Sequence, residues 1–116
     1  MRPAGEQRPI RVRVFGIDTP ERGEPFATVA RNRTRVLVFD KAVRVTGQSV
    51  DRYGRLVARV KVDDLDLAAA LLREGLACHY TRFSDDRIYA EAQAAARSLG
   101  LGFWARDAEK PRCVVR

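Results

Sequence analysis

A short stretch near the start of the chain gathers side chains that suit phosphodiester chemistry. Arg13 lies on the polar face of an alternating apolar run, which leads into Asp18, Thr19 and Glu21, and Arg55 opens another such run. Carboxylate and carbonyl oxygens suit a hard cation such as Ca²⁺, a carboxylate can orient or deprotonate water, and arginines stabilise charge that develops on phosphorus. Each residue alone is more typical of a turn or a surface ion pair, but together they favour phosphodiester hydrolysis.

The balance of charged residues favours a polyanionic partner. Lysine and arginine total 22 against 15 aspartates and glutamates, which gives a net charge of +7. Arginine dominates, and it suits flat, bidentate contact with phosphate. Arg31 and Arg35 lie one turn apart in a predicted helix, and no recognition helix or zinc finger is evident. We therefore expect electrostatic binding to nucleic acid without sequence preference. Arginine-rich coding in a GC-rich genome is the alternative source of this charge.

Length and composition exclude several classes. The chain has 116 residues, enough for one domain. No apolar run approaches the ~20 residues of a membrane span, so we expect no membrane partner, and Met1 to Arg8 carry no apolar signal-peptide core. Cys78 and Cys113, with the single His79, do not make a zinc site. The cysteines form one disulfide if the protein is exported, or else remain unrelated thiols. A lone histidine is more often structural than catalytic.

The spacing of apolar residues predicts an α+β fold. Strands are expected at about 10–15, 43–50 and 55–62, a hairpin turn at 51–54, helices at about 25–39, 67–75 and 86–98, and an extended stretch at 76–83. Asp66 is expected to cap the second helix and Ser84 or Asp85 the third, with Gly75 and Gly100 ending them. Strands that meet through tight hairpins predict a small antiparallel barrel. This domain is expected at 10–105, between a polar N-terminal tail at 1–9 and a C-terminal tail at 106–116.

Two motifs resemble the signature of the staphylococcal nuclease family, the thermonucleases. The first runs from Arg13 to Glu21 (RVFGIDTPE), and the second from Asp51 to Leu56 (DRYGRL). The segment from Arg73 to Ala77, and a last helix that runs into Gly102-Phe103-Trp104, are similar to later elements of the family. The likeness covers about Arg11 to Trp104. Two such motifs, in order and correctly separated, are far more specific than a lone glycine-rich match.

The resemblance implies an oligonucleotide-binding (OB) fold, a five-stranded barrel with three helices, and a secreted or periplasmic location. It implies a Ca²⁺-dependent endonuclease, a hydrolase that cleaves DNA and RNA without sequence specificity and leaves 3′-phosphate ends. The implied site residues are the metal ligands Asp18 (carboxylate) and Thr19 (carbonyl), Glu21 acting on the attacking water, Arg13 and Arg55 on the scissile phosphate, and Tyr80 and Phe83 flanking the base. For Phe83, core packing is an equally plausible role, and Tyr53 in the hairpin turn is more typical of a structural residue.

The start of the chain departs from the family pattern. The family has a first strand and an Asp-Gly-Asp hairpin ahead of this region, whereas the only acid before Arg13 is Glu6. We therefore expect one calcium carboxylate and the first strand to be absent, nuclease activity to be weak, and two chains to pair as a homodimer through the open barrel edge. The alternative function is a catalytically inactive module that binds nucleic acid or protein. Glu21 beside Asp18 favours the enzyme, because a pure binder does not need it.

Overall fold

The computed structural model describes residues 10–115, which form two small sheets and four α-helices. In chain order the elements are β1 (Val12–Val14), β2 (Ile17–Asp18), α1 (Ala27–Val38), β3 (Val43–Val50), β4 (Leu56–Val62), β5 (Leu65–Asp66), α2 (Leu67–Arg73), β6 (Cys78–His79), α3 (Arg87–Leu99), the 3₁₀ helix η2 (Gly102–Trp104) and α4 (Arg112–Val115). The predicted α+β class is confirmed. The predicted polar tail at 1–9 lies outside the described residues.

Strand β4 is the centre of the larger sheet. It pairs with β3 and β5 in antiparallel fashion, but β1 pairs with it in parallel, with Val12 beside Leu56 and Val14 beside Ala58. The expectation of a purely antiparallel barrel was therefore wrong. Parallel neighbours need a long crossover, and α1 and β3 supply it, whereas tight hairpins join only β3 to β4 and β4 to β5. The described strands form one four-stranded and one two-stranded sheet without a closed barrel.

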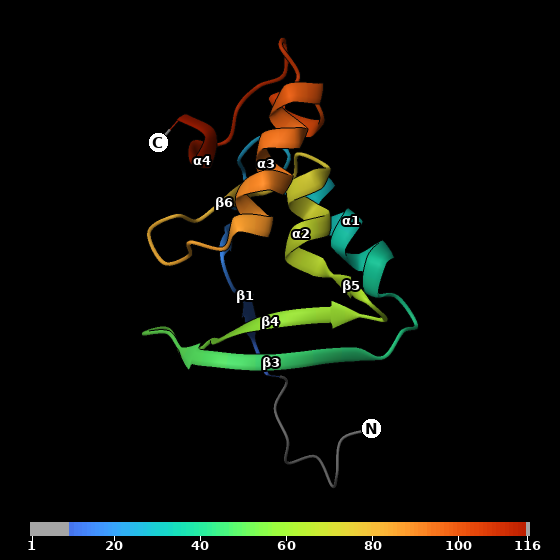
Figure 1. Ribbon diagram of the computed structural model, residues 1–116, viewed down its shortest axis with the longest axis vertical. Coiled ribbons are helices and arrows are strands. Elements are labelled where there is room, and N and C mark those ends of the chain that lie inside the picture. The colour runs from blue at the N-terminus through green and yellow to red at the C-terminus, as the bar shows by residue number, and fades with distance from the viewer. Residues whose placement is uncertain (1–9, 116) are drawn as a thin grey trace, which may run out of the picture.

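The two faces of β4 differ as the alternation predicts. Ala58, Val60 and Val62 are buried, whereas Arg59 and Lys61 lie on the other face. All eight residues of β3 are exposed, and Figure 1 shows β3 as the strand farthest from the helices. Among the described strands, β1 and β3 pair with β4 on one side only. Pairing of two chains along such an edge stays a prediction.

Helix α2 forms the middle of the core. Its residues Leu67 to Leu72 are all buried, which is typical of a helix that is apolar on every side. The Asp66 carboxylate accepts a hydrogen bond from the Ala68 N–H at 3.0 Å, and Gly75 follows the helix with a positive φ of 72°. Both predicted ends are confirmed. Helices α1 and α3 flank α2 (Figure 1), and the described helices include none with the length and apolarity of a membrane span.

Helix α3 is tied to the sheet through Tyr89, which is almost fully buried. The Tyr89 hydroxyl donates to Asp66 Oδ2 at 2.7 Å, and Arg59 reaches both this hydroxyl and Asp86. Burial first, then the Asp66 carboxylate, raises the pKa of Tyr89 well above its ordinary value, so the hydroxyl stays a donor. The cap of α3 is Asp86, whose side chain accepts from the Tyr89 N–H, and the expected Ser84 or Asp85 cap was wrong. Ser84 instead accepts from the Asp86 N–H.

The C-terminal residues, which we expected to form a tail, fold back onto the domain. Pro111 is buried, and the Lys110 ammonium donates to the carbonyl oxygen of Phe103 at 2.8 Å. Helix α4 follows, and Cys113 forms a disulfide with Cys78 of β6 across a Cα–Cα distance of 6.1 Å. The sequence left open whether the two cysteines form a disulfide or remain separate thiols, and the structure contains the disulfide. Figure 1 shows α4 next to β6.

The disulfide is expected to carry a large share of the stability of this small domain. It joins residues 35 apart in the sequence. A cross-link of that span lowers the conformational entropy of the unfolded chain, which stabilises the folded state by about 3–4 kcal/mol. Cys113→Ser should lower the free energy of unfolding by about 3 kcal/mol, measured by urea denaturation. A reductant should give the same loss in the parent and none in the variant. Equal stability of parent and variant would contradict the bridge.

Candidate active site

A cleft of about 1280 Å³ is lined by all seven site residues that the family resemblance implies. It lies among β1, β2, the end of β3, the turn at 51–54 and the loop after β6. The predicted site residues in its wall are Arg13, Asp18, Thr19, Glu21, Arg55, Tyr80 and Phe83. Segments far apart in the sequence therefore converge on one surface. Five arginines and three acids line the cleft, so its charge favours an anion.

Strand register places the two predicted phosphate contacts on one face of the sheet. Arg13 pairs with Val57 across the parallel β1–β4 ladder, and Arg55 precedes Val57 by two residues. Side chains two apart on a strand share a face, so both guanidinium groups leave the sheet on the same side. This face is opposite the buried one that carries Ala58 and Val60.

Arg55 is held by the turn that precedes it. Its Nε donates to Asp51 Oδ2 at 2.8 Å, while Asp51 Oδ1 accepts from the N–H groups of Tyr53 and Arg55, each at 2.9 Å. Partial burial raises the pKa of Asp51, but those N–H groups and the guanidinium outweigh it, so the pKa lies below its ordinary value. Asp51 therefore stays a carboxylate and orients Arg55 toward the cleft.

Aromatic rings form part of the cleft wall. The Arg13 guanidinium lies 5.2 Å from the centre of the Tyr80 ring, and Phe83 meets that ring edge-on at 5.3 Å. Phe83 is 68% exposed, so the core-packing role considered for it was wrong. Tyr53 also lines the cleft, with the guanidinium of Arg55 5.6 Å from its ring centre. The sequence indicates a structural role for Tyr53 in the turn. The signal of its place in the cleft wall is the pair of nearby arginines, Arg52 and Arg55.

A tight turn leads from β1 into the acidic part of the cleft. Gly16 has a φ of 84°, and a Cβ there would lie 2.8 Å from the Tyr89 ring, so only glycine fits. The next strand, β2, places Asp18 beside Cys78 of β6 and leaves it partly buried. Thr19 and Glu21 follow, and both are exposed to the cleft.

The loop that carries Glu21 is held by Glu24, which lies outside both motifs. Glu24 Oε1 accepts from the Glu21 N–H at 2.8 Å, and Glu24 Oε2 accepts from the Arg112 N–H of α4 at 3.2 Å. The Arg112 guanidinium lies 3.8 Å from the same carboxylate. The loop is thereby linked to the segment that the disulfide holds. The signal in the sequence was an acid three residues after Glu21, next to Gly23.

Part of a calcium site fits the residues present. The Asp18 carboxylate and the Thr19 carbonyl are oxygen donors of the kind that Ca²⁺ prefers, with the exposed Glu21 nearby. Ca²⁺ takes 6–8 oxygen ligands, and the described residues contain no group of three or more acidic, histidine or cysteine side chains able to hold a metal. If Ca²⁺ binds here, most of its ligands would have to be oxygens of water and of substrate phosphate.

His79 lies outside this chemistry. It is the second residue of β6 and is buried, with Nε2 2.9 Å from the Ser84 hydroxyl and the ring edge-on against Tyr89. Burial lowers the pKa of His79 more than the nearby Asp86 and Asp85 raise it, so the ring is neutral at pH 7. His79 is absent from the cleft wall. It packs the core, in keeping with the structural role that a lone histidine favours.

Comparison with known proteins agrees with the motifs. A family described as "Staphylococcal nuclease homologue" matches residues 11–106. An uncharacterized endonuclease of Haemophilus influenzae is 34% identical over 96 residues, 83% of this chain and 54% of the relative. A micrococcal nuclease of Shigella flexneri is 35% identical, covering 88% of this chain and 66% of the relative. A staphylococcal-like nuclease of Arabidopsis thaliana is 32% identical over 88% of this chain and 32% of its own length.

The chain thus spans about half the length of the Haemophilus relative and a third of the Arabidopsis one. The match nevertheless covers the whole region from the first site arginine to the residues after η2. An OB-type arrangement, which the family implies, is in keeping with a central β4 that has a parallel and an antiparallel neighbour. The resemblance seen in the two motifs is confirmed, and the chain belongs to the staphylococcal nuclease family.

Proposed function

We propose that the protein is a nuclease that hydrolyses phosphodiester bonds of DNA and RNA without sequence specificity and depends on Ca²⁺. The observation that carries the proposal is the convergence of Arg13, Arg55, Asp18 and Glu21 on one cleft. Relatives that are themselves named nucleases, from bacteria and a plant, add support. The proposal concerns this chain, which is shorter than those relatives.

Each side chain has a distinct task in the proposed reaction. Arg13 and Arg55 bind the non-bridging oxygens of the scissile phosphate and stabilise the charge that grows on them. Glu21 accepts a proton from the attacking water, whose oxygen forms a bond to phosphorus while an ester P–O bond breaks. The leaving oxygen takes a proton from solvent. The Asp18 carboxylate and the Thr19 carbonyl would hold Ca²⁺, which would supply positive charge to offset that of the phosphate.

Stacking without base-specific hydrogen bonds explains the proposed lack of sequence preference. Tyr80, Phe83 and Tyr53 offer exposed ring surface in the cleft wall, and every base has a face that stacks on an aromatic ring. The arginines contact phosphate, which is the same at every position. We also propose an oxidising compartment, either secreted or periplasmic, because disulfides such as Cys78–Cys113 persist there and are rare in the cytosol.

A second candidate function is a binding module without catalysis. It is favoured by the lack of a three-ligand metal cluster among the described residues. The same observation predicts weak calcium binding if the protein is an enzyme. The two candidates differ in turnover and metal dependence and agree on nucleic-acid binding, so a digestion assay separates them.

We expect slow digestion of plasmid DNA and RNA that requires Ca²⁺ at about 10⁻⁴–10⁻³ M, because few anionic ligands hold the ion. EDTA should abolish digestion, and added Ca²⁺ in excess should restore it. Gel electrophoresis of the products over time is the measurement. Full activity in EDTA would contradict the proposed dependence on Ca²⁺. No digestion of either substrate at saturating Ca²⁺ would favour the binding module.

Replacements in the cleft should separate catalysis from binding. Glu21→Gln is expected to reduce kcat with little change in DNA affinity, because only water activation is lost. Arg13→Ala and Arg55→Ala should reduce kcat by about 10²-fold, as loss of a transition-state donor does elsewhere. Glu91→Gln is a matched control, since Glu91 is exposed on α3 outside the cleft. Parent-like cleavage by all three cleft variants would refute the assignment.

Asp51 is expected to act only through Arg55. Asp51→Ala should lower kcat/KM by about tenfold, corresponding to a coupling of ~1.4 kcal/mol between contacting groups. Asp51→Asn should cost less, because the amide oxygen still accepts the two backbone N–H bonds of the turn. In a background that already carries Arg55→Ala, Asp51→Ala should cause no further loss of kcat/KM. Additive losses in this double-mutant cycle would show that Asp51 acts independently.

A further inference from the structure

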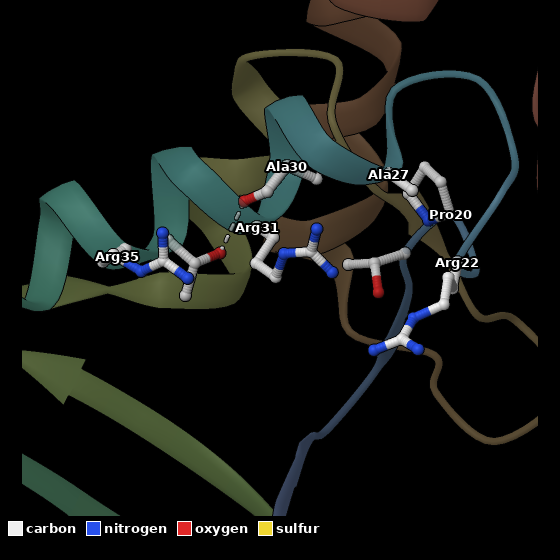
Figure 2. A pocket seen from close by; sticks show the side chains of 8 residues that line it. Pro20, Arg22, Ala27, Ala30, Arg31 and Arg35 are labelled. Atoms are coloured by element: carbon white, nitrogen blue, oxygen red, sulfur yellow. Dashed lines mark hydrogen bonds between the residues drawn. The ribbon is translucent and has the colours of Figure 1, made fainter.

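A second pocket of about 450 Å³ lies beside the cleft, between helix α1 and the loop that follows β2. Its wall includes Arg22 from the loop and Arg31 and Arg35 from α1. Figure 2 shows Arg31 between Arg35 and Arg22, with the three guanidinium groups gathered along the pocket. The motifs do not include these arginines, and the reaction proposed above does not use them.

The charge of this pocket is uncompensated. No acidic side chain lines it, and among the described residues no carboxylate forms an ion pair with any of its three arginines. Arg33, which lies between the two helix arginines in sequence, behaves differently, because it forms a bidentate pair with Glu74 of the α2 C-cap at 2.7 and 3.1 Å. The charge on the inner side of α1 is thus neutralised, while Arg31 and Arg35 remain exposed on the outer side.

The other polar side chains that line the pocket are neutral, so none of them pairs with the arginines in place of an anionic ligand. The Thr34 hydroxyl donates to the Ala30 carbonyl at 2.9 Å, and the Arg35 guanidinium donates to the neutral Asn32 amide oxygen at 3.4 Å. An anion in the pocket would therefore meet guanidinium groups on two sides. Guanidinium groups bind phosphate in a flat, bidentate geometry.

The pocket and the cleft adjoin each other. Thr19, Pro20 and Arg22 belong to the walls of both. We propose that the second pocket binds a phosphate of the same nucleic-acid strand, one or more nucleotides away from the bond to be cut. The inference rests on the nucleic-acid substrate proposed above. The shared wall favours a strand over an acidic protein, because a strand that leaves the cleft past Thr19 reaches Arg22 and then Arg31.

A subsite of this kind makes affinity depend on strand length. A dinucleotide has one phosphate, which binds to Arg13 and Arg55. It has no second phosphate for the α1 arginines, so they add nothing to its affinity. A longer strand gains contacts with Arg31 and Arg35. Each phosphate contact on single-stranded nucleic acid contributes about 0.7 to the slope of log K against log salt.

The binding test uses a fluorescently labelled single-stranded oligonucleotide in EDTA, so that no cleavage occurs, with anisotropy measured over a range of NaCl concentrations. Arg31→Ala/Arg35→Ala should lower the magnitude of the salt slope by about 0.7, because the contact with one phosphate is lost. The matched control is Arg73→Ala/Arg106→Ala, which removes the same charge from exposed positions outside both cavities. Circular dichroism checks that all three proteins fold alike.

The kinetic test compares a long single strand with a dinucleotide at saturating Ca²⁺. In the α1 variant, the ratio of kcat/KM on the strand to kcat/KM on the dinucleotide should fall about tenfold, which corresponds to ~1.4 kcal/mol. A salt slope equal to the parent's, or an equal decrease in the control, overturns the subsite and leaves the pocket to another anion such as an acidic protein. If the unsubstituted protein binds with the expected salt slope but never cleaves, the nuclease proposal is refuted while phosphate binding by the second pocket is supported.

Discussion

Backbone pairing on both edges of β4 is the constraint on which the rest of the structure depends. On one edge the parallel ladder to β1 sets Arg13 next to Val57, and on the other the hairpin from β3 brings the turn with Asp51 to the start of β4. One face of the same strand is buried against the helices. A shift of one residue in either ladder would exchange the two faces and send the arginines into the core.

Much of this arrangement follows from local patterns in the sequence. Alternation predicted which face of β4 is buried, and the caps and stops of α2 follow from the chemistry of Asp66 and Gly75. The two motifs contain five of the seven predicted site residues in the cleft wall, and the family resemblance at the aromatic stretch indicated the other two, Tyr80 and Phe83. Motif residues are readable because they lie in short runs, where spacing along the chain determines which side chains share a turn or a face.

Features set by long-range contacts were not readable in this way. The parallel β1–β4 pair joins strands separated by more than forty residues, and a preference for hairpins does not reveal it. The last residues look polar and irregular, yet Cys113 and Lys110 anchor them. Tyr53 lies within the second motif, and Arg31 and Arg35 lie one helical turn apart, but neither pattern shows which surface these side chains line. Their importance comes from the surfaces that surround them, which only folding assembles.

The contact between Glu24 and Arg112 ties the loop that carries Glu21 to helix α4. Glu24 holds the Glu21 backbone with one oxygen and the start of α4 with the other. Protease trimming after residue 105, or a bulky fusion joined there, would release Glu24 from α4 and remove the disulfide in the same cut. The family match ends at residue 106, so a chain shortened there would keep the matched region but lose the contacts that hold the Glu21 loop to α4.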